Sequence, residues 1–112
     1  MILVDTSVWI DFFADADKDH VKKFKEALEQ NENVCICGVI MTEVLHGIRS
    51  DSEFVHTQNA LKKLIYLPFN QEIFINAASI YRLLRKNGIT LQSPTDCLIA
   101  SLAIYYKVPL LH

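Results

Sequence analysis

The first ten residues, MILVDTSVWI, limit the possible folds of this chain more than any other stretch. An apolar run, Met1–Val4, leads directly into Asp5, and the helix-capping residue types Thr6 and Ser7 follow. A short continuous apolar run is typical of a strand buried on both faces, as in the middle of a parallel sheet. The pattern therefore predicts a central strand that turns at once into a helix. Asp5 would lie at the carboxyl edge of the sheet, where open α/β sheets bind ligands.

The rest of the chain alternates between helix and strand signals. Apolar residues at helical spacing, together with capping and turn residues, predict helices over 7–14, 18–30, 38–49, 52–65, 71–87 and 94–106. Short apolar runs predict strands over 34–37, 66–69 and 108–111. Pro68 places the second of these at an edge or an end, and the third is expected to be buried. A loop is expected from Asn87-Gly88 to Ser93. This alternation predicts an α/β domain with a parallel sheet.

Composition limits the class of protein. Hydrophobic residues make up 51% of the 112 residues, which is enough for a core and excludes global disorder. The formal net charge of −2 gives no overall basic field, so contact with nucleic acid requires a local patch. We find no apolar run of about 18 residues and no basic leader. We therefore expect a single soluble, cytoplasmic domain over 1–112.

The cysteines agree with a reducing compartment. Cys35, Cys37 and Cys97 are odd in number, which does not suggest a disulfide framework. Cys35 and Cys37 alternate within a predicted strand, and a Cys-x-Cys metal pair is one interpretation of them. Buried thiols are favoured instead, because no second cysteine pair completes a zinc site.

Three acidic residues stand apart from the other acids of the chain. Most of the 13 Asp and Glu residues lie in polar surroundings, whereas Asp5, Glu43 and Asp96 are isolated in apolar segments. The strand–helix order brings all three to the carboxyl edge of the sheet. Clustered carboxylates repel one another. A divalent cation removes that conflict, and oxygen-only ligands favour Mg²⁺ or Mn²⁺.

Two of these acids also have a simpler explanation as helix caps. Asp5 precedes a predicted helix and fits an N-cap position. Ser93, Pro94 and Asp96 fit N-cap, N1 and N3 of the next helix. The two roles are compatible, because a carboxylate in a first helical turn also stays near the sheet edge.

Other polar residues allow more than one interpretation. Glu43-x-x-His46 has a metal-ligand spacing, but a solvent-facing or core-edge histidine is favoured. The remaining histidines have no obvious acidic partner. Arg82, Arg85 and Lys86 share one helical face, either as an RNA contact or as cations that favour the helix C-terminus.

Three segments resemble a known family. MILVDTSVWIDFF, TEVLHGIR and SPTDCLIASLA are similar to the motif blocks of PIN-domain ribonucleases, specifically the VapC-type toxins of toxin–antitoxin pairs. The resemblance implies a three-layer α/β/α sandwich around a parallel sheet. It also implies RNA cleavage that depends on Mg²⁺ or Mn²⁺, with Asp5, Glu43 and Asp96 as catalytic and metal-binding residues. Thr6, Ser7 and Arg49 match supporting positions, and the implied partners are an antitoxin and a second copy of the chain.

The sequence departs from the family pattern in one respect. The family has a fourth acid in a loop after its fourth strand, followed by a last strand, and the printed sequence ends at His112, where that loop would start. We expect weaker metal binding and poor activity without it. Two alternatives remain: an inactive remnant that only binds an antitoxin, or a receiver-like binding module. The second lacks support, since no acid precedes Asp5 and no suitable lysine follows the last strand.

Aromatic residues suggest association. Trp9, Phe12, Phe13, Phe54 and the pair Tyr105–Tyr106 offer more aromatic surface than a small core is expected to bury. We expect a homodimer, and an antitoxin that lays a helix or an extended segment into a groove between helices near the N-terminus.

Overall fold

The structure is a computed structural model that describes residues 1–90 and 93–112. Within these residues a parallel sheet of four strands, in the order β3-β2-β1-β4, forms the centre. Its strands are β1 (Ile2–Val4), β2 (Val34–Ile36), β3 (Ile65–Tyr66) and β4 (Leu110–Leu111). In β1, Leu3 pairs with Cys35 on one side and with Leu110 on the other. Leu3 and Val4 are wholly buried, which confirms the predicted central strand.

The helices follow the predicted order. They are α1 (Thr6–Phe13), α2 (Asp19–Glu29), α3 (Gly38–Leu45), α4 (Asp51–Lys62), α5 (Gln71–Lys86) and α6 (Thr95–Tyr106). The largest difference between a predicted and an observed helix is at α3, which ends at Leu45 and not near Arg49. Gly47 is a poor helix former, and the Ser50 hydroxyl starts α4 by accepting a hydrogen bond from the Glu53 N–H.

The connection between α5 and α6 begins as predicted. Gly88 follows α5 in a left-handed conformation with φ of 77°, which a residue without Cβ adopts at little cost. Residues 91–92 of the predicted loop lie outside the described residues.

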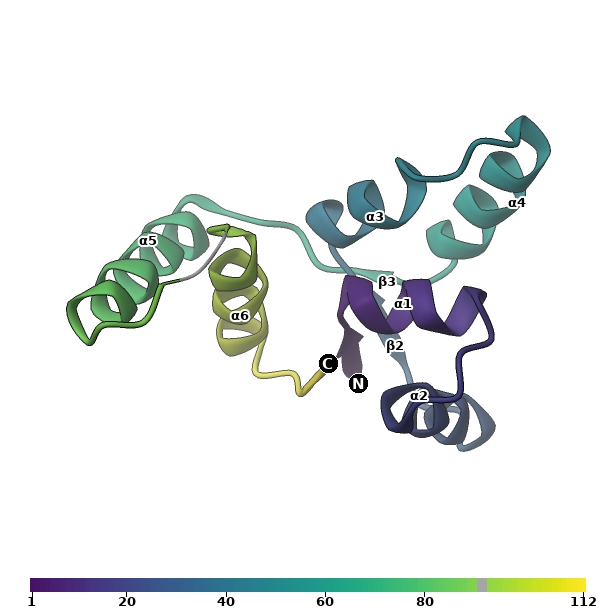
Figure 1. Ribbon diagram of the computed structural model, residues 1–112, viewed down its shortest axis with the longest axis horizontal. Coiled ribbons are helices and arrows are strands. Elements are labelled where there is room, and N and C mark those ends of the chain that lie inside the picture. Colours follow the sequence, from purple (N-terminus) through teal and green to yellow (C-terminus); the bar gives the residue numbers. More distant parts are fainter. Residues whose placement is uncertain (91–92) are drawn as a thin grey trace.

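Helices cover both faces of the sheet. The chain steps from β1 to β2 to β3 through α1–α4, and then returns past β1 to β4 through α5 and α6. Because such crossovers are right-handed, the change of direction puts the two groups of helices on opposite faces. Figure 1 shows α1 to α4 on one side of the strands, and α5 and α6 on the other. The predicted α/β/α sandwich is confirmed.

The edge strands are only partly covered. Ile65 and Tyr66 of β3 are exposed at one edge, as the nearby Pro68 predicted. Val108 is buried, but Leu110 and Leu111 of β4 are half-buried. The prediction of a buried strand over 108–111 is therefore wrong for its second half, because β4 pairs with β1 alone among the described strands.

Candidate active site

Asp5 lies at the start of α1, but its carboxylate does not cap the helix. It occupies the N-cap position in an extended conformation, yet among the described residues its side chain accepts no hydrogen bond from the helix backbone. Instead, Ser7 Oγ donates to Asp5 Oδ2 over 3.0 Å. The cap alternative therefore does not explain Asp5, and a serine hydroxyl in the first turn of α1 holds one of its carboxylate oxygens.

Glu43 is joined to the same turn of α1 from a different part of the chain. It lies half-buried on α3, and Thr6 Oγ1 donates to Glu43 Oε1 over 2.8 Å. Thr6 and Glu43 are 37 residues apart, and they meet because α1 and α3 both begin at the carboxyl ends of neighbouring strands. The residues predicted as supporting, Thr6 and Ser7, thus each hold one predicted acid.

Asp96 comes from the opposite face of the sheet. It lies exposed in the first turn of α6. Together with Asp5 and Ser7 it lines a cavity of about 400 Å³, which Ile99, Leu110 and His112 complete. The structure places Pro94, and not the predicted Ser93, at the N-cap of α6, although the Ser93 hydroxyl accepts a hydrogen bond from the Thr95 N–H over 3.2 Å.

The structure brings two of the three acids to one cavity and places the third in a neighbouring groove. Asp5 and Asp96 share the cavity, whereas Glu43 lines an adjacent groove and reaches α1 through Thr6. No group of three His, Cys, Asp or Glu side chains placed to hold one ion occurs in the described part of the chain. Convergence of all three carboxylates on a shared ion stays a prediction.

The chemistry of the donor set fits a hard cation. The groups at the sheet edge are carboxylate and hydroxyl oxygens, the ligands that Mg²⁺ and Mn²⁺ prefer. The neighbouring thiol of Cys37 does not compete as a thiolate. Burial raises its pKa, and the negative charges of Glu43 and Asp5 act in the same direction.

The predicted basic residues lie on α5 and in the connection from α3 to α4. Arg82, Arg85 and Lys86 are exposed on α5, which Figure 1 places on the far side of α6 from the sheet. The Arg85 guanidinium stacks over Tyr81 at 5.8 Å from the ring centre. Arg49 is exposed in the connection from α3 to α4, and no ion pair to it occurs within residues 1–90 and 93–112.

The histidines differ from expectation at one position. His46 Nδ1 is 2.8 Å from the Glu43 backbone oxygen, which agrees with the favoured interpretation of an exposed residue. His20 has the acidic partner that the sequence did not suggest: its Nε2 lies 2.6 Å from Asp11 Oδ2, and Lys18 Nζ lies 3.2 Å from the same oxygen. The prediction of no acidic partner for His20 is wrong, because the partner belongs to another helix.

The aromatic residues divide into core and surface. Trp9 is 6% exposed and packs against Phe24, so its predicted surface role is wrong. Phe13 is 52% exposed and lines the groove that Glu43 also lines. This groove has a volume of about 770 Å³ and lies between α1, α3 and α4. Its apolar lining includes Ile10, Phe13, Ala14, Val44 and Ile48.

Comparison with known proteins gives consistent matches along the whole chain. A model of the PIN domain family matches residues 2–112. Ribonuclease VapC11 of Mycobacterium tuberculosis is 33% identical over 114 residues, which cover 100% of this chain and 85% of that protein. Ribonuclease VapC1 of Methanocaldococcus jannaschii is 34% identical over 110 residues, which cover 97% of this chain and 72% of that protein.

Solved structures agree on the fold. A toxin–antitoxin complex from Klebsiella pneumoniae is similar with a TM-score of 0.76 and 21% identity, covering 98% of this chain and 83% of that chain. VapBC2 from Rickettsia felis, bound to a promoter DNA fragment, has a TM-score of 0.76 and 20% identity, and the match covers 98% of this chain and 85% of that chain.

Among the described residues, none of the helices has both the length and the apolar character of a membrane span.

Proposed function

The chain belongs to the PIN-domain family, and from this premise we propose that it is a VapC-type toxin ribonuclease that cleaves RNA with the help of Mg²⁺ or Mn²⁺. One observation carries the proposal within the chain itself. Two adjacent hydroxyls in the first turn of α1, Thr6 and Ser7, each donate to a different predicted acid. Such an arrangement orients carboxylates that would otherwise be free to rotate.

The acids would hold the cation. Asp5, Glu43 and Asp96 would supply carboxylate oxygens at the carboxyl edge of the sheet, and their three negative charges would more than balance the +2 charge of one ion. A divalent cation bound there supplies a water of lowered pKa and offsets the charge that develops on the phosphate.

The hydroxyls would orient the acids. Ser7 holds one oxygen of Asp5, and Thr6 holds one oxygen of Glu43, so the second oxygen of each carboxylate is left for ligand binding. Outer hydrogen bonds of this kind fix the direction of metal-binding side chains. Ile99 and Leu110 give the cavity an apolar wall, which limits the access of bulk water.

The basic residues would contact RNA away from the site of cleavage. Arg49 is exposed between α3 and α4, and we assign it to the RNA near the groove. Arg82, Arg85 and Lys86 lie beyond α6, so they fit only a distant part of a large, folded RNA (Figure 1). The proposed location is the cytoplasm, where the chain would meet both RNA and an antitoxin.

The groove between α1, α3 and α4 would bind the antitoxin. Five apolar side chains line it together with six polar ones, which include Glu43 and Glu53. An amphipathic helix or extended segment of the antitoxin fits such a surface. The homodimer expected from the exposed aromatic residues remains part of the proposal, and light scattering at high protein concentration measures it directly.

Acid substitutions test the catalytic part of the proposal. Asp5→Asn, Glu43→Gln and Asp96→Asn should each lower Mn²⁺-dependent RNA cleavage by about 100-fold or more, since a neutral amide binds a divalent cation weakly. Glu29→Gln, an exposed acid on α2, is the matched control and should cleave like the unchanged chain. Cleavage that persists in chelator, or in the Asp96→Asn variant, would contradict the assignment.

Groove substitutions test the partner. Phe13→Ser should prevent co-purification with the small protein encoded by the neighbouring reading frame, because it removes an exposed apolar contact from the groove. Leu28→Ser is the control, since Leu28 is similarly exposed, at 43%, but lies on α2 outside the groove. Equal loss of co-purification in both variants would exclude the groove as the docking site.

A further inference from the structure

A second polar cluster lies beside the acids, and the proposed mechanism does not use it. Asp11 on α1 accepts from Lys18 Nζ over 3.2 Å and lies 2.6 Å from His20 Nε2. The side chains of Asp11 and His20 are 20% and 23% exposed, and that of Lys18 is 57% exposed. The cluster is therefore ordered by its contacts and still reaches the surface.

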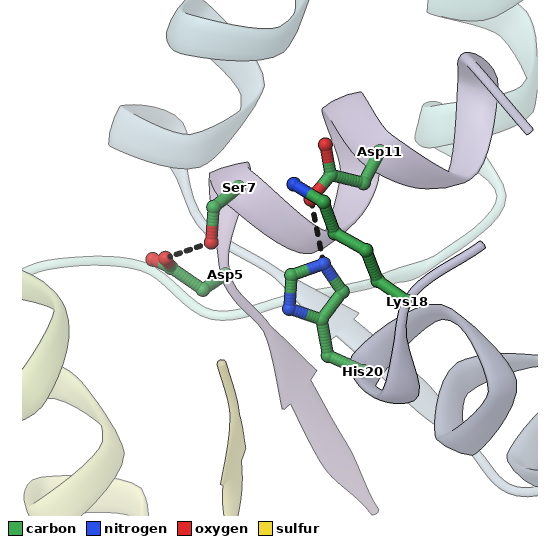
Figure 2. Close-up of polar contacts among 5 residues, drawn as sticks. All are labelled: Asp5, Ser7, Asp11, Lys18 and His20. Carbon is green, nitrogen blue, oxygen red and sulfur yellow. Dashed lines mark hydrogen bonds and ion pairs between the residues drawn. The ribbon is translucent and has the colours of Figure 1, made fainter. Parts of the chain in front are cut away.

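The position of the cluster ties it to the acidic cavity. Ser7, which holds Asp5 and lines the cavity, is four residues before Asp11 on α1. Residues four apart lie on the same face of a helix, about one turn or 5.4 Å along its axis. Figure 2 shows the Asp5–Ser7 pair and the Asp11–His20–Lys18 group following one another along α1. A strand of RNA that leaves the cavity along this face would meet the cluster next.

The hydrogen bonding fixes the chemistry of His20. The hydrogen bonds from His20 and Lys18 hold the pKa of Asp11 below its usual value, so its carboxylate is ionised at neutral pH and only accepts. His20 Nε2 therefore carries the proton that Asp11 accepts. The other ring nitrogen, Nδ1, makes no hydrogen bond within the described residues. In Figure 2 it lies on the edge of the ring turned toward the side of Asp5 and Ser7.

The free nitrogen matches a group that RNA has and DNA lacks. Nδ1 accepts a hydrogen bond when the ring is neutral and donates one when the ring is charged. A ribose 2′-hydroxyl both donates and accepts, so it pairs with His20 in either state. Lys18 is engaged by a single carboxylate oxygen and has further N–H groups for a phosphate.

We propose that His20 and Lys18 bind the substrate strand beside the acidic cavity, with His20 Nδ1 on a ribose 2′-hydroxyl and Lys18 Nζ on a phosphate oxygen. Asp11 is a positioning residue that orients both. The inference rests on the proposed ribonuclease function and adds a residue that distinguishes RNA from DNA. Two lysines of α2 are placed differently. Lys22 pairs with Asp17 and Lys25 pairs with Asp15, and both of these acids are highly exposed.

Binding without cleavage tests the inference. Fluorescence anisotropy in chelator measures the Kd of the whole chain for a short single-stranded RNA and for DNA of the same sequence. His20→Ala and His20→Phe should each raise the Kd for RNA about 5-fold, the size of one neutral hydrogen bond, and leave the Kd for DNA unchanged. The phenylalanine variant keeps a ring between α1 and α2, so a loss in both variants is not a folding effect.

Substitutions of Lys18 and Lys22 test whether the charge of Lys18 contributes to nucleic-acid binding. Lys18→Ala should weaken the binding of RNA and DNA equally and lower the slope of log K against log salt by about one. Lys22→Ala, four residues further along the chain and with the same number of ion pairs, should leave both Kd values and the slope unchanged.

The outcomes separate this inference from the proposed function. The inference would be overturned if the preference for RNA over DNA were the same with and without His20, or if the Lys18 and Lys22 variants lost equal binding affinity. In either case, cleavage by the unchanged chain would still support the nuclease. An unchanged chain that neither binds nor cleaves RNA would overturn both. An unchanged chain that cleaves RNA but binds DNA equally well would overturn the role of His20.

Discussion

The acids at the carboxyl edge of the sheet fall into two regions that differ in how they are held. On the side of α1 and α3, Asp5 and Glu43 each accept a hydrogen bond from a hydroxyl of α1. On the side of α6, Asp96 is exposed and makes no side-chain hydrogen bond within the described residues. A carboxylate that is already hydrogen-bonded keeps its direction before a ligand arrives, whereas a free one loses rotamer entropy on binding. One half of the candidate site is therefore preformed, and we expect the other half to become ordered only when a ligand binds.

The preformed half depends on two consecutive residues. Successive side chains on a helix point about 100° apart, because a turn contains about 3.6 residues. Thr6 therefore reaches across to α3, while Ser7 reaches back to Asp5. A single turn of α1 orients acids from two different strand–helix units.

The largest effect is expected from the half-buried member of this pair. Thr6→Val removes the donor to Glu43 while keeping the shape of the side chain. It should lower the kcat of Mn²⁺-dependent cleavage by about 10- to 100-fold, as for the loss of a hydrogen bond to a charged group. Thr42→Val on α3 is the control, because the Thr42 hydroxyl bonds only to the Gly38 backbone oxygen. Equal activity of the two variants would show that the hydrogen bond from Thr6 to Glu43 does not matter for cleavage.

A smaller effect is expected at Ser7. Ser7→Ala leaves Asp5 partly exposed, so water can replace the lost donor, and cleavage should fall by about 2- to 5-fold. Ser79→Ala on α5 is the control, since its hydroxyl bonds to the Ile75 backbone oxygen. A loss at Ser7 larger than the loss at Thr6 would mean that Asp5, not Glu43, depends more on its hydroxyl.

The free acid should matter little to stability. Asp96→Ala should change the free energy of unfolding by no more than about 0.5 kcal/mol without metal, as for an exposed side chain without partners. Added Mn²⁺ should stabilise the unchanged chain more than this variant, because binding to the native state adds to stability. Chemical denaturation with and without Mn²⁺ measures both effects. A metal-free loss above about 2 kcal/mol would show that Asp96 is also held.

The smallest effect concerns pH and the neighbouring Asp11. Its pKa is held below the ordinary value of 3.8 by His20 and Lys18, so its contribution to stability is present above that value and is lost as pH falls through the lower folded pKa. The Tm of the unchanged chain should therefore exceed that of Asp11→Asn at pH 7, and the two should converge in acid. Asp17→Asn, a highly exposed acid, is the control for charge alone. A difference in Tm that stays constant down to acid pH would argue against ionised Asp11 as the partner of His20.

Sequence reasoning succeeded where the signals were local. The apolar run at Met1–Val4, the helical spacing after it and the glycine at position 88 predicted the central strand, the order of elements and the end of the helix before that glycine. Strand–helix order predicts the acids at one edge of the sheet, and the structure brings two of them, Asp5 and Asp96, to one cavity. The motif blocks predicted the family, and the match over residues 2–112 confirmed it.

Sequence reasoning failed where the answer depended on how helices rotate against one another. Trp9 was expected at the surface, but it packs in the core against Phe24, because α2 covers that face of α1. The same packing brings His20 to Asp11, a pair that no spacing within one helix indicates.

The sequence by itself determined the order of the strands and helices and the parallel fold that they form, and it predicts which acids lie at the carboxyl edge of the sheet, since both follow from local patterns and from the handedness of parallel crossovers. Only the tertiary structure decided that Thr6 holds Glu43, that Ser7 holds Asp5, and that Asp96 is left free. The physical reason is that these contacts depend on the rotation and separation of packed helices. Many side chains share in setting those quantities, and no short stretch of sequence encodes them.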